Sequence, residues 1–268
     1  MIALSLVIAL AYSGLAWHFW RTRWRSLGTA HPREEQFALL LVLVGHGAML
    51  FHEITHGNIL GFSAGSALSL TLWLSVAIFW SGSFYYRLDG IQPLLLPAAA
   101  LATLAGTLTP TLRSFHGTEL PAFRAHVLAA ILSYSLLTIA ALIAVLMSVA
   151  DKRLHQHTRS SLATNLPPLL GLESLLFKVL GAGFVLLTAT LASGVLFSEE
   201  IFHRPFQFNH KNLFTLIAWM VFAALLTGRQ LMGWRGRTAV RWTLSGFSLL
   251  LLAYAGSKFV LEVLLQRS

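Results

Sequence analysis

Long apolar stretches separated by short polar segments run along the whole chain. They fall near residues 1–20, 37–54, 64–86, 93–109, 122–149, 174–197, 212–229 and 240–264. A bilayer-crossing helix needs about 20 mostly apolar residues, whereas a transmembrane β-strand alternates apolar and polar residues. The continuous runs therefore predict an all-α, polytopic membrane protein with about eight transmembrane helices, which form a single membrane domain over residues 1–268.

Small residues recur within two of these stretches and predict close contacts between helices. Gly181, Gly183 and Gly194 follow one another in the sixth stretch, and Ala98–Ala100 precede Gly106 in the fourth. In membranes, small side chains let helix backbones approach closely. We expect these positions to form packing surfaces.

The positive charges predict the orientation of the chain in the membrane. The first stretch has no basic residue before it and is followed by Arg21, Arg23 and Arg25, the reverse of a cleavable signal peptide. If the N-terminus lies outside, 13 of the 19 Lys and Arg residues fall in or beside the inner loops. Because cytoplasmic loops are enriched in Lys and Arg, we expect both termini outside, in a multi-pass protein of a bacterial inner membrane.

The amino-acid composition limits the class of protein and the kinds of cofactor site that are possible. The chain is 56% hydrophobic and 11% charged, whereas a soluble domain carries about a quarter charged residues. It contains no cysteine, which excludes disulfides, thiolate metal sites and iron–sulfur clusters. The net charge of +9 is attributed to cytoplasmic loops in contact with the lipid bilayer, and no nucleic-acid partner is expected.

Histidines are the most informative polar residues, since the chain has eleven of them. His46 lies in the middle of the second apolar stretch, and six others fall at the predicted outer ends: His52, His56, His116, His126, His203 and His210. A polar residue inside a membrane is costly, and imidazole is the commonest metal ligand. The outer group therefore suggests metal or haem ligation; the alternative is that each histidine binds a carbonyl or a lipid headgroup.

One motif suggests a zinc protease. His52-Glu53-Ile-Thr-His56 fits the H-E-x-x-H pattern, and Leu88-Asp89-Gly90 is similar to a motif of intramembrane proteases. In the predicted topology, however, the two motifs lie on opposite sides of the membrane, about 30 Å apart. One zinc ion cannot use both, so the protease is kept only as an alternative.

Two segments resemble the cytochrome c assembly family of haem-handling membrane proteins. Ala125-His126 followed by Leu132-Ser133-Tyr134 resembles the start of a core helix of that family. The segment from Phe206 to Lys211 aligns with the family's tryptophan-rich outer loop, with phenylalanine in place of tryptophan, and Gly233-Trp-Arg-Gly-Arg237 is similar to its end. The resemblance covers about residues 90–265 and is greatest to the YpjD- and HemX-like branch.

The resemblance implies that haem b is the cofactor. Haem needs an aromatic slot, axial imidazoles and cations for its propionates. His126 is then one expected axial ligand of the iron. The family's second outer histidine has no counterpart near the end of the last stretch, so His210, on the same side, is expected to replace it, with His116 as a further candidate. The other expected contacts are stacking by Phe206 and Phe208, pairing of propionates by Arg124 and Lys211, and ligation of a second haem by His46.

We therefore expect a haem-binding protein that transports or chaperones haem, or has an accessory role in cytochrome c assembly. It is not expected to be an enzyme with catalytic groups of its own. Its expected partners are other cytochrome c assembly proteins or an apocytochrome. The alternatives are a haem-free scaffold of the same family, which works through partners, and the zinc protease. Whether His52 and His56 bind a metal stays open.

Overall fold

The computed structural model describes residues 2–25, 27, 29, 31–56, 64–86, 88–109, 121–155, 168–196 and 210–259. Within these residues the chain forms eight α-helices and no strand. The helices are α1 (Ile2–Phe19), α2 (Pro32–His56), α3 (Ala64–Gly82), α4 (Gln92–Leu108), α5 (Pro121–His155), α7 (Leu169–Leu196), α9 (His210–Met232) and α10 (Arg237–Phe259), with a π-helical segment, η1 (Trp20–Trp24), directly after α1. The predicted all-α architecture is confirmed.

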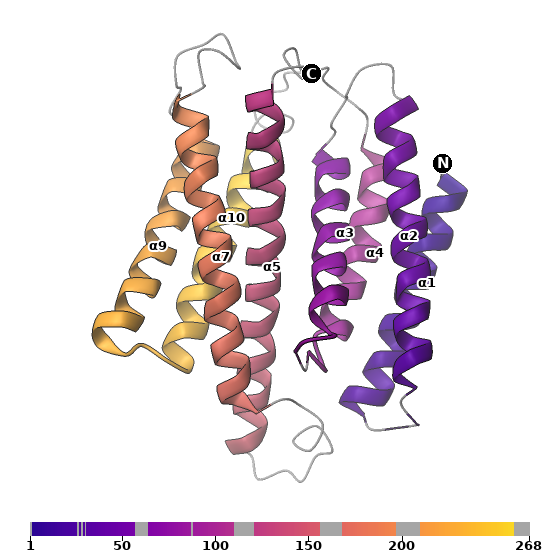
Figure 1. The fold of residues 1–268 in the computed structure, drawn as a ribbon, viewed down its shortest axis with the longest axis horizontal. Helices are drawn as coiled ribbons and strands as arrows, with labels where there is room; N and C mark the ends of the chain where they lie inside the picture. Colours follow the sequence, from indigo (N-terminus) through magenta and orange to yellow (C-terminus); the bar gives the residue numbers. More distant parts are fainter. Residues whose placement is uncertain are drawn as a thin grey trace. The chain divides into compact units, whose positions relative to one another are not determined.

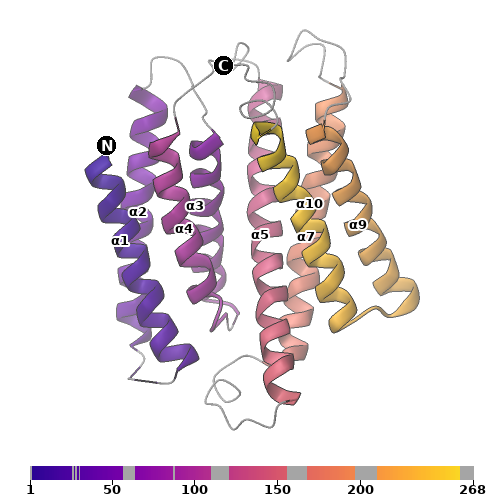
Figure 2. The same cartoon turned by 180° about the vertical axis from the view of Figure 1, so that it is seen from behind.

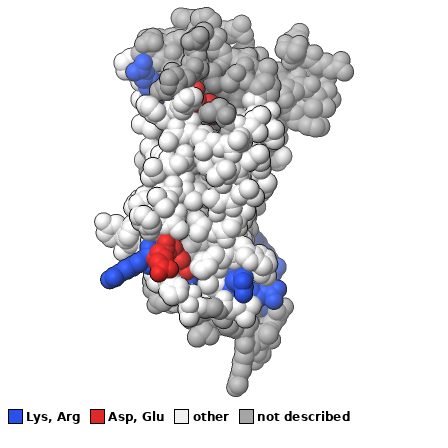
Figure 3. All heavy atoms as spheres, turned by 90° about the vertical axis from the view of Figure 1, so that its right-hand side faces the viewer, with Lys and Arg blue, Asp and Glu red and all other residues white. Residues whose placement is uncertain are grey.

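Most of the helices have the length and composition of membrane spans. Among the described residues, six are long and apolar enough to cross a bilayer, and α4 is a shorter apolar helix. On the face shown in Figure 3, described Lys, Arg, Asp and Glu side chains lie toward the two ends and leave a broad middle band without them. Such a band is what a hydrocarbon core about 30 Å thick requires. The chain is a polytopic membrane protein.

The chain divides into two compact units. Unit 1 comprises Met1–Thr118 and Val149–Gly171, and unit 2 comprises Glu119–Ser148 and Leu172–Ser268. Unit 1 therefore contains α1 to α4, and unit 2 contains most of α5 together with α7, α9 and α10. A single membrane domain over residues 1–268 stays a prediction.

The four helices of unit 1 run alternately up and down (Figures 1 and 2). Helix α4 packs against both α1 and α3, and α2 packs against α1 and α3. Small residues permit this packing, because a Cβ atom at Gly106 of α4 would lie 3.3 Å from Cβ of Ser69 on α3. The predicted role of the small residues of this stretch is confirmed at Gly106.

Proline and acidic residues define where helices begin. Helix α2 starts at Pro32 and carries Glu34 and Glu35 in its first turn. Proline loses no hydrogen bond at this position, and carboxylates are favourable near a helix N-terminus. Helix α4 likewise has Pro93 in its first turn and tolerates Pro97 further along.

In unit 2, the Ser133 hydroxyl of α5 donates a hydrogen bond to the backbone carbonyl of Gly183 on α7, 2.9 Å away. A Cβ atom at Gly183 would lie 3.0 Å from the side chain of Leu137, so the glycine permits this contact. By contrast, a Cβ at Gly181 would have no neighbour within 4 Å. The predicted packing role is confirmed for Gly183 but not for Gly181.

A tight turn joins α9 to α10 and holds the two helices against each other. Gly233 and Gly236 have positive φ angles of 67° and 54°, a conformation that glycine adopts without strain. Along the two helices, a Cβ atom at Gly246 would lie 2.6 Å from the ring of Phe222. The missing side chain therefore allows α10 to lie directly on this aromatic ring.

Candidate functional site

His126 lies in the second turn of α5 and is held by a side chain of α7. Its Nδ1 atom lies 2.8 Å from the hydroxyl oxygen of Ser193. That hydroxyl donates its own hydrogen to the carbonyl of Thr190, 3.1 Å away. Ser193 therefore accepts the hydrogen bond from His126, which places the ring proton on Nδ1 and leaves the lone pair on Nε2.

The imidazole of His126 thus has the form of a metal ligand. Metal-binding histidines usually donate their second ring N–H to a fixed neighbouring group, which sets the tautomer and the ring orientation. The ring is partly exposed, and no described residue hydrogen-bonds to Nε2. A Cβ atom at Gly194 would lie 3.4 Å from Cε1 of the ring, so this glycine keeps one edge of the imidazole uncrowded.

Cationic and polar groups of α9 accompany His126 in unit 2. Lys211, in the first turn of α9, is exposed, and its positive charge acts on His126. The Tyr134 side chain of α5 is hydrogen-bonded to Thr215. The hydroxyl of Thr215 in turn donates to the carbonyl of Lys211, 2.8 Å away. The Ser133-Tyr134 step of the sequence thus ties α5 to both α7 and α9.

The structure describes some of the other predicted haem-contacting residues but does not bring them together. His210, the first residue of α9, and Arg124 of α5 are both exposed, and no hydrogen bond joins His210 to His126 among the described residues. His116, Phe206 and Phe208 lie outside the described residues. The axial pair and the aromatic slot therefore stay predictions.

His46 lies at the centre of unit 1 in a closed polar cluster. It is completely buried, with the Tyr12 hydroxyl 3.3 Å from Nδ1 and the Ser69 hydroxyl 2.9 Å from Nε2. The Thr103 hydroxyl lies 3.4 Å from the same Nε2 atom. Both ring nitrogens are engaged in this arrangement, so an iron atom at Nε2 would have to replace Ser69. Ligation of a second haem by His46 stays a prediction.

The H-E-x-x-H segment lies at the C-terminal end of α2, whereas Asp89 lies beside the N-terminal end of that helix. Asp89 and Glu35 of α2 both pair with Arg23. Glu35 is 17 residues before His52, which corresponds to about 26 Å along the helix. Glu53 instead accepts a hydrogen bond from the Ser66 hydroxyl of α3, at 2.7 Å. Among the described residues, no group of three His, Asp or Glu side chains is placed to hold a metal ion.

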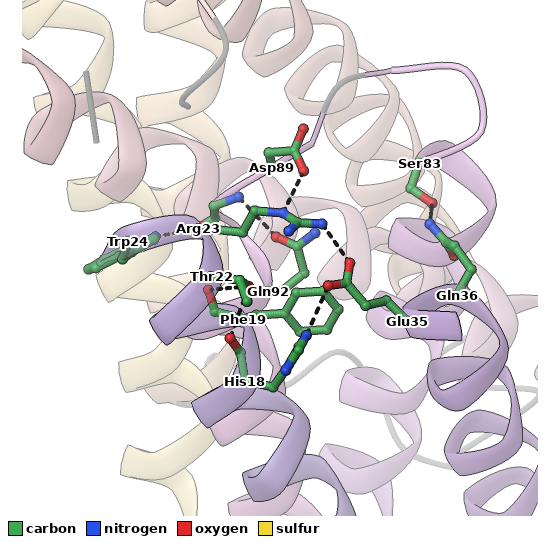
Figure 4. Close-up of polar contacts among 11 residues, drawn as sticks. His18, Phe19, Thr22, Arg23, Trp24, Glu35, Gln36, Ser83, Asp89 and Gln92 are labelled. Atoms are coloured by element: carbon green, nitrogen blue, oxygen red, sulfur yellow. Dashed lines mark hydrogen bonds and ion pairs between the residues drawn. The ribbon is translucent and has the colours of Figure 1, made fainter. Parts of the chain in front are cut away.

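The structure reveals a charged cluster in unit 1 that the sequence did not predict. Nη2 of Arg23 donates to Glu35 at 2.6 Å, and its Nε donates to Asp89 at 3.0 Å (Figure 4). The second oxygen of Glu35 lies 2.9 Å from Nε2 of His18. The Arg23 and Glu35 side chains are both mostly buried. This cluster joins η1, α2 and the segment between α3 and α4.

Comparison with known proteins identifies the family. The family model for cytochrome C assembly protein matches residues 30–265. Inner membrane protein YpjD of Escherichia coli is 34% identical over 175 residues, which cover 64% of this chain and 65% of that protein. An uncharacterized 28.8 kDa protein of Azospirillum brasilense is 33% identical over 212 residues, covering 75% of this chain and 77% of that protein.

A third relative carries a functional name. Cytochrome c biogenesis protein CcsA of Guillardia theta is 30% identical over 150 residues, which are half of each chain. The match to the Escherichia coli protein spans just under two thirds of that protein's length. No solved structure matches the chain significantly. Because the family model covers most of the sequence, the chain belongs to the cytochrome c assembly protein family.

Proposed function

We propose that this chain binds haem b on unit 2 and handles it for cytochrome c assembly. In this role it is a haem carrier or accessory factor and lacks catalytic groups of its own. The observation that carries the proposal is the hydrogen-bond chain from His126 through Ser193 to Thr190. This chain holds a neutral imidazole with the Nε2 lone pair available, as an axial haem ligand requires.

The neighbouring residues fit the acidic groups of haem. The charge of Lys211 acts on His126, and Arg124 lies in the first turn of the helix that carries His126. Both side chains are exposed, so each can pair with a propionate. His210 is the proposed second axial ligand. When bound, haem supplies an iron that takes axial nitrogen ligands, while the protein holds and orients the ring.

Family membership supports the location and the partners. A relative is named as an inner membrane protein and another as a cytochrome c biogenesis protein. We therefore propose that the chain is a multi-pass protein of a bacterial inner membrane, with both termini outside. An apocytochrome or another cytochrome c assembly protein is the proposed recipient of the haem.

Spectroscopic titration with haem tests the proposal. The full chain in detergent is titrated with haem, alongside His126→Gly and a control, His31→Ala, which alters an exposed histidine bonded to Thr29. We expect His126→Gly to weaken haem binding at least about tenfold and added imidazole to restore the axial ligand. His31→Ala should bind like the parent.

Substitution of the second proposed ligand distinguishes six-coordinate from five-coordinate haem. His210→Ala should leave haem bound but convert the low-spin spectrum to a high-spin one, because one axial nitrogen is removed. Equal haem affinity in the parent and His126→Gly would contradict the proposal. A parent protein that takes up no haem would favour a scaffold that works through partners.

A further inference from the structure

Unit 1 contains a cavity beside the charged cluster of Arg23, at the end of the helices that carries η1. Its volume is about 320 Å³. Its polar lining residues are Arg23, Glu35, Gln36, Ser83, Asp89 and Gln92. Three aromatic residues of the segment after α3 also line the cavity and are exposed: Phe84, Tyr85 and Tyr86. The cavity is therefore both polar and aromatic, and large enough for a small organic group.

Two carboxylates share one arginine beside the cavity. Among the described residues that line it, Arg23 is the one Lys or Arg, and it faces both Glu35 and Asp89. Both oxygens of Glu35 are occupied, by Arg23 and His18. Asp89 uses only Oδ1, and its Oδ2 atom has no partner among the described residues. Among the described residues, one carboxylate oxygen of this cluster is therefore left for a ligand.

Gln36 adds a second unused acceptor. Its amide nitrogen donates to the Ser83 hydroxyl at 2.8 Å (Figure 4), which fixes the side chain. Its Oε1 atom is buried and has no hydrogen-bond partner among the described residues. A buried acceptor without a partner is unfavourable, and native proteins normally satisfy it with a protein group, an ordered water or a ligand. Because this oxygen is closed to solvent, a ligand in the cavity reaches it once the Gln36 side chain turns toward the cavity.

Gln92 has an unused hydrogen-bond donor, its side-chain amide nitrogen. The residue is only 7% exposed, and its Oε1 accepts a hydrogen bond from the backbone N–H of Gly90 at 2.9 Å. Its amide nitrogen has no acceptor among the described residues. The cavity thus offers acceptors for a positively charged donor and a nearby donor for an oxygen atom.

We propose that this cavity binds the primary ammonium group of ethanolamine, either as the headgroup of phosphatidylethanolamine or as a free amine. Its N–H groups would donate to Oδ2 of Asp89 and, once the Gln36 side chain turns toward the cavity, to Gln36. The aromatic rings would favour a cation. The oxygen two carbons away would accept from Gln92. A trimethylammonium group has no N–H to donate and would leave both acceptors unpaired. This site is separate from the proposed haem function.

Native mass spectrometry of the delipidated full chain tests the proposal. The chain is titrated with phosphatidylethanolamine and, separately, with phosphatidylcholine of identical acyl chains. We expect about tenfold tighter binding of phosphatidylethanolamine, because only its headgroup can donate charge-assisted hydrogen bonds. Equal binding of the two lipids would overturn the proposal without any variant being needed.

A matched pair of variants locates the binding. Asp89→Asn removes a charge that lines the cavity, and Glu34→Gln removes an exposed one on α2 that does not. The preference for phosphatidylethanolamine should disappear in Asp89→Asn and persist in Glu34→Gln. Persistence in both variants would place the lipid elsewhere and overturn the proposal.

Competition with soluble ligands identifies the source of the amine. Free ethanolamine or phosphoethanolamine that displaces the lipid at comparable concentration would point to a soluble ligand of the same site. Displacement only at a large excess would identify the lipid as the ligand. Either result agrees with an ammonium site, whereas no displacement at any concentration would contradict it.

Discussion

The hydroxyl oxygen of Ser193 lies 2.8 Å from Nδ1 of His126. Ser193→Ala would remove the acceptor that sets the tautomer of the imidazole. We expect haem affinity to fall about 10- to 100-fold, the usual effect of losing such a supporting hydrogen bond. Absorption titrations with haem measure the change.

Thr190→Val is the control for this prediction. It removes a hydroxyl one turn away on α7 but keeps the backbone carbonyl that accepts from Ser193. Haem affinity in this variant should equal that of the parent. A similar loss in both variants would mean that general disturbance of α7, and not the hydrogen bond, causes the effect.

His46→Leu should destabilise unit 1. The substitution leaves the buried hydroxyls of Tyr12 and Ser69 without their partner, which costs about 1–3 kcal/mol for an unsatisfied group. A lower midpoint of thermal unfolding in detergent measures this loss, with exposed His52→Leu as the control.

The same variant tests whether His46 binds haem. Hydroxyls already engage both ring nitrogens, so the predicted second haem requires Nε2 to give up Ser69. A haem-to-protein ratio that falls to half in His46→Leu would confirm the prediction of a second haem, and an unchanged ratio would contradict it.

Arg23→Ala should destabilise the protein more than substitution of any exposed arginine nearby. Arg23 and Glu35 side chains are 12% and 7% exposed, so the substitution leaves a buried carboxylate without its cation. Breaking such a buried pair lowers the free energy of unfolding by about 3–5 kcal/mol. Arg25→Ala, which removes an exposed arginine over Trp20, should cost under about 1 kcal/mol. Equal unfolding midpoints for the two variants would contradict this account of the cluster.

Two glycines offer a matched test of packing in unit 2. A Cβ atom at Gly228 would lie 2.5 Å from the Trp234 ring, whereas one at Gly181 would have no neighbour within 4 Å. Gly228→Ala should therefore destabilise the protein by about 1–3 kcal/mol. Gly181→Ala should be neutral or stabilising, since alanine favours the helix. Thermal unfolding of both variants checks the difference, and a reversed order would contradict the packing described.

The number and order of the helices could be predicted from the sequence because each apolar stretch is long and continuous. The residues at which the helices begin and end were less predictable. Helix α5 continues to His155, beyond the predicted end at residue 149, because charged residues outside a bilayer do not end a helix. Helix α7 begins at Leu169, before the predicted residue 174, and η1 continues the chain from α1 through residues expected to be loop.

The partners of individual side chains could not be predicted. His126 was identified from its resemblance to a family motif, but Ser193 is 67 residues away in sequence and carries no signal of its own. Likewise, Arg23 was counted only as a positive loop charge. Its carboxylate partners, Glu35 and Asp89, come from two other segments, which only the packing of unit 1 brings together.

The most direct test of the account is an absorption spectrum of the detergent-purified protein, oxidised and then reduced with dithionite, with metal analysis of the same sample. We predict a Soret band that sharpens on reduction, with α and β bands of six-coordinate b-type haem that are lost in His126→Gly. A flat spectrum after haem supplementation would contradict the haem-binding account. Stoichiometric zinc in that flat sample would instead favour chemistry at His52 and Glu53.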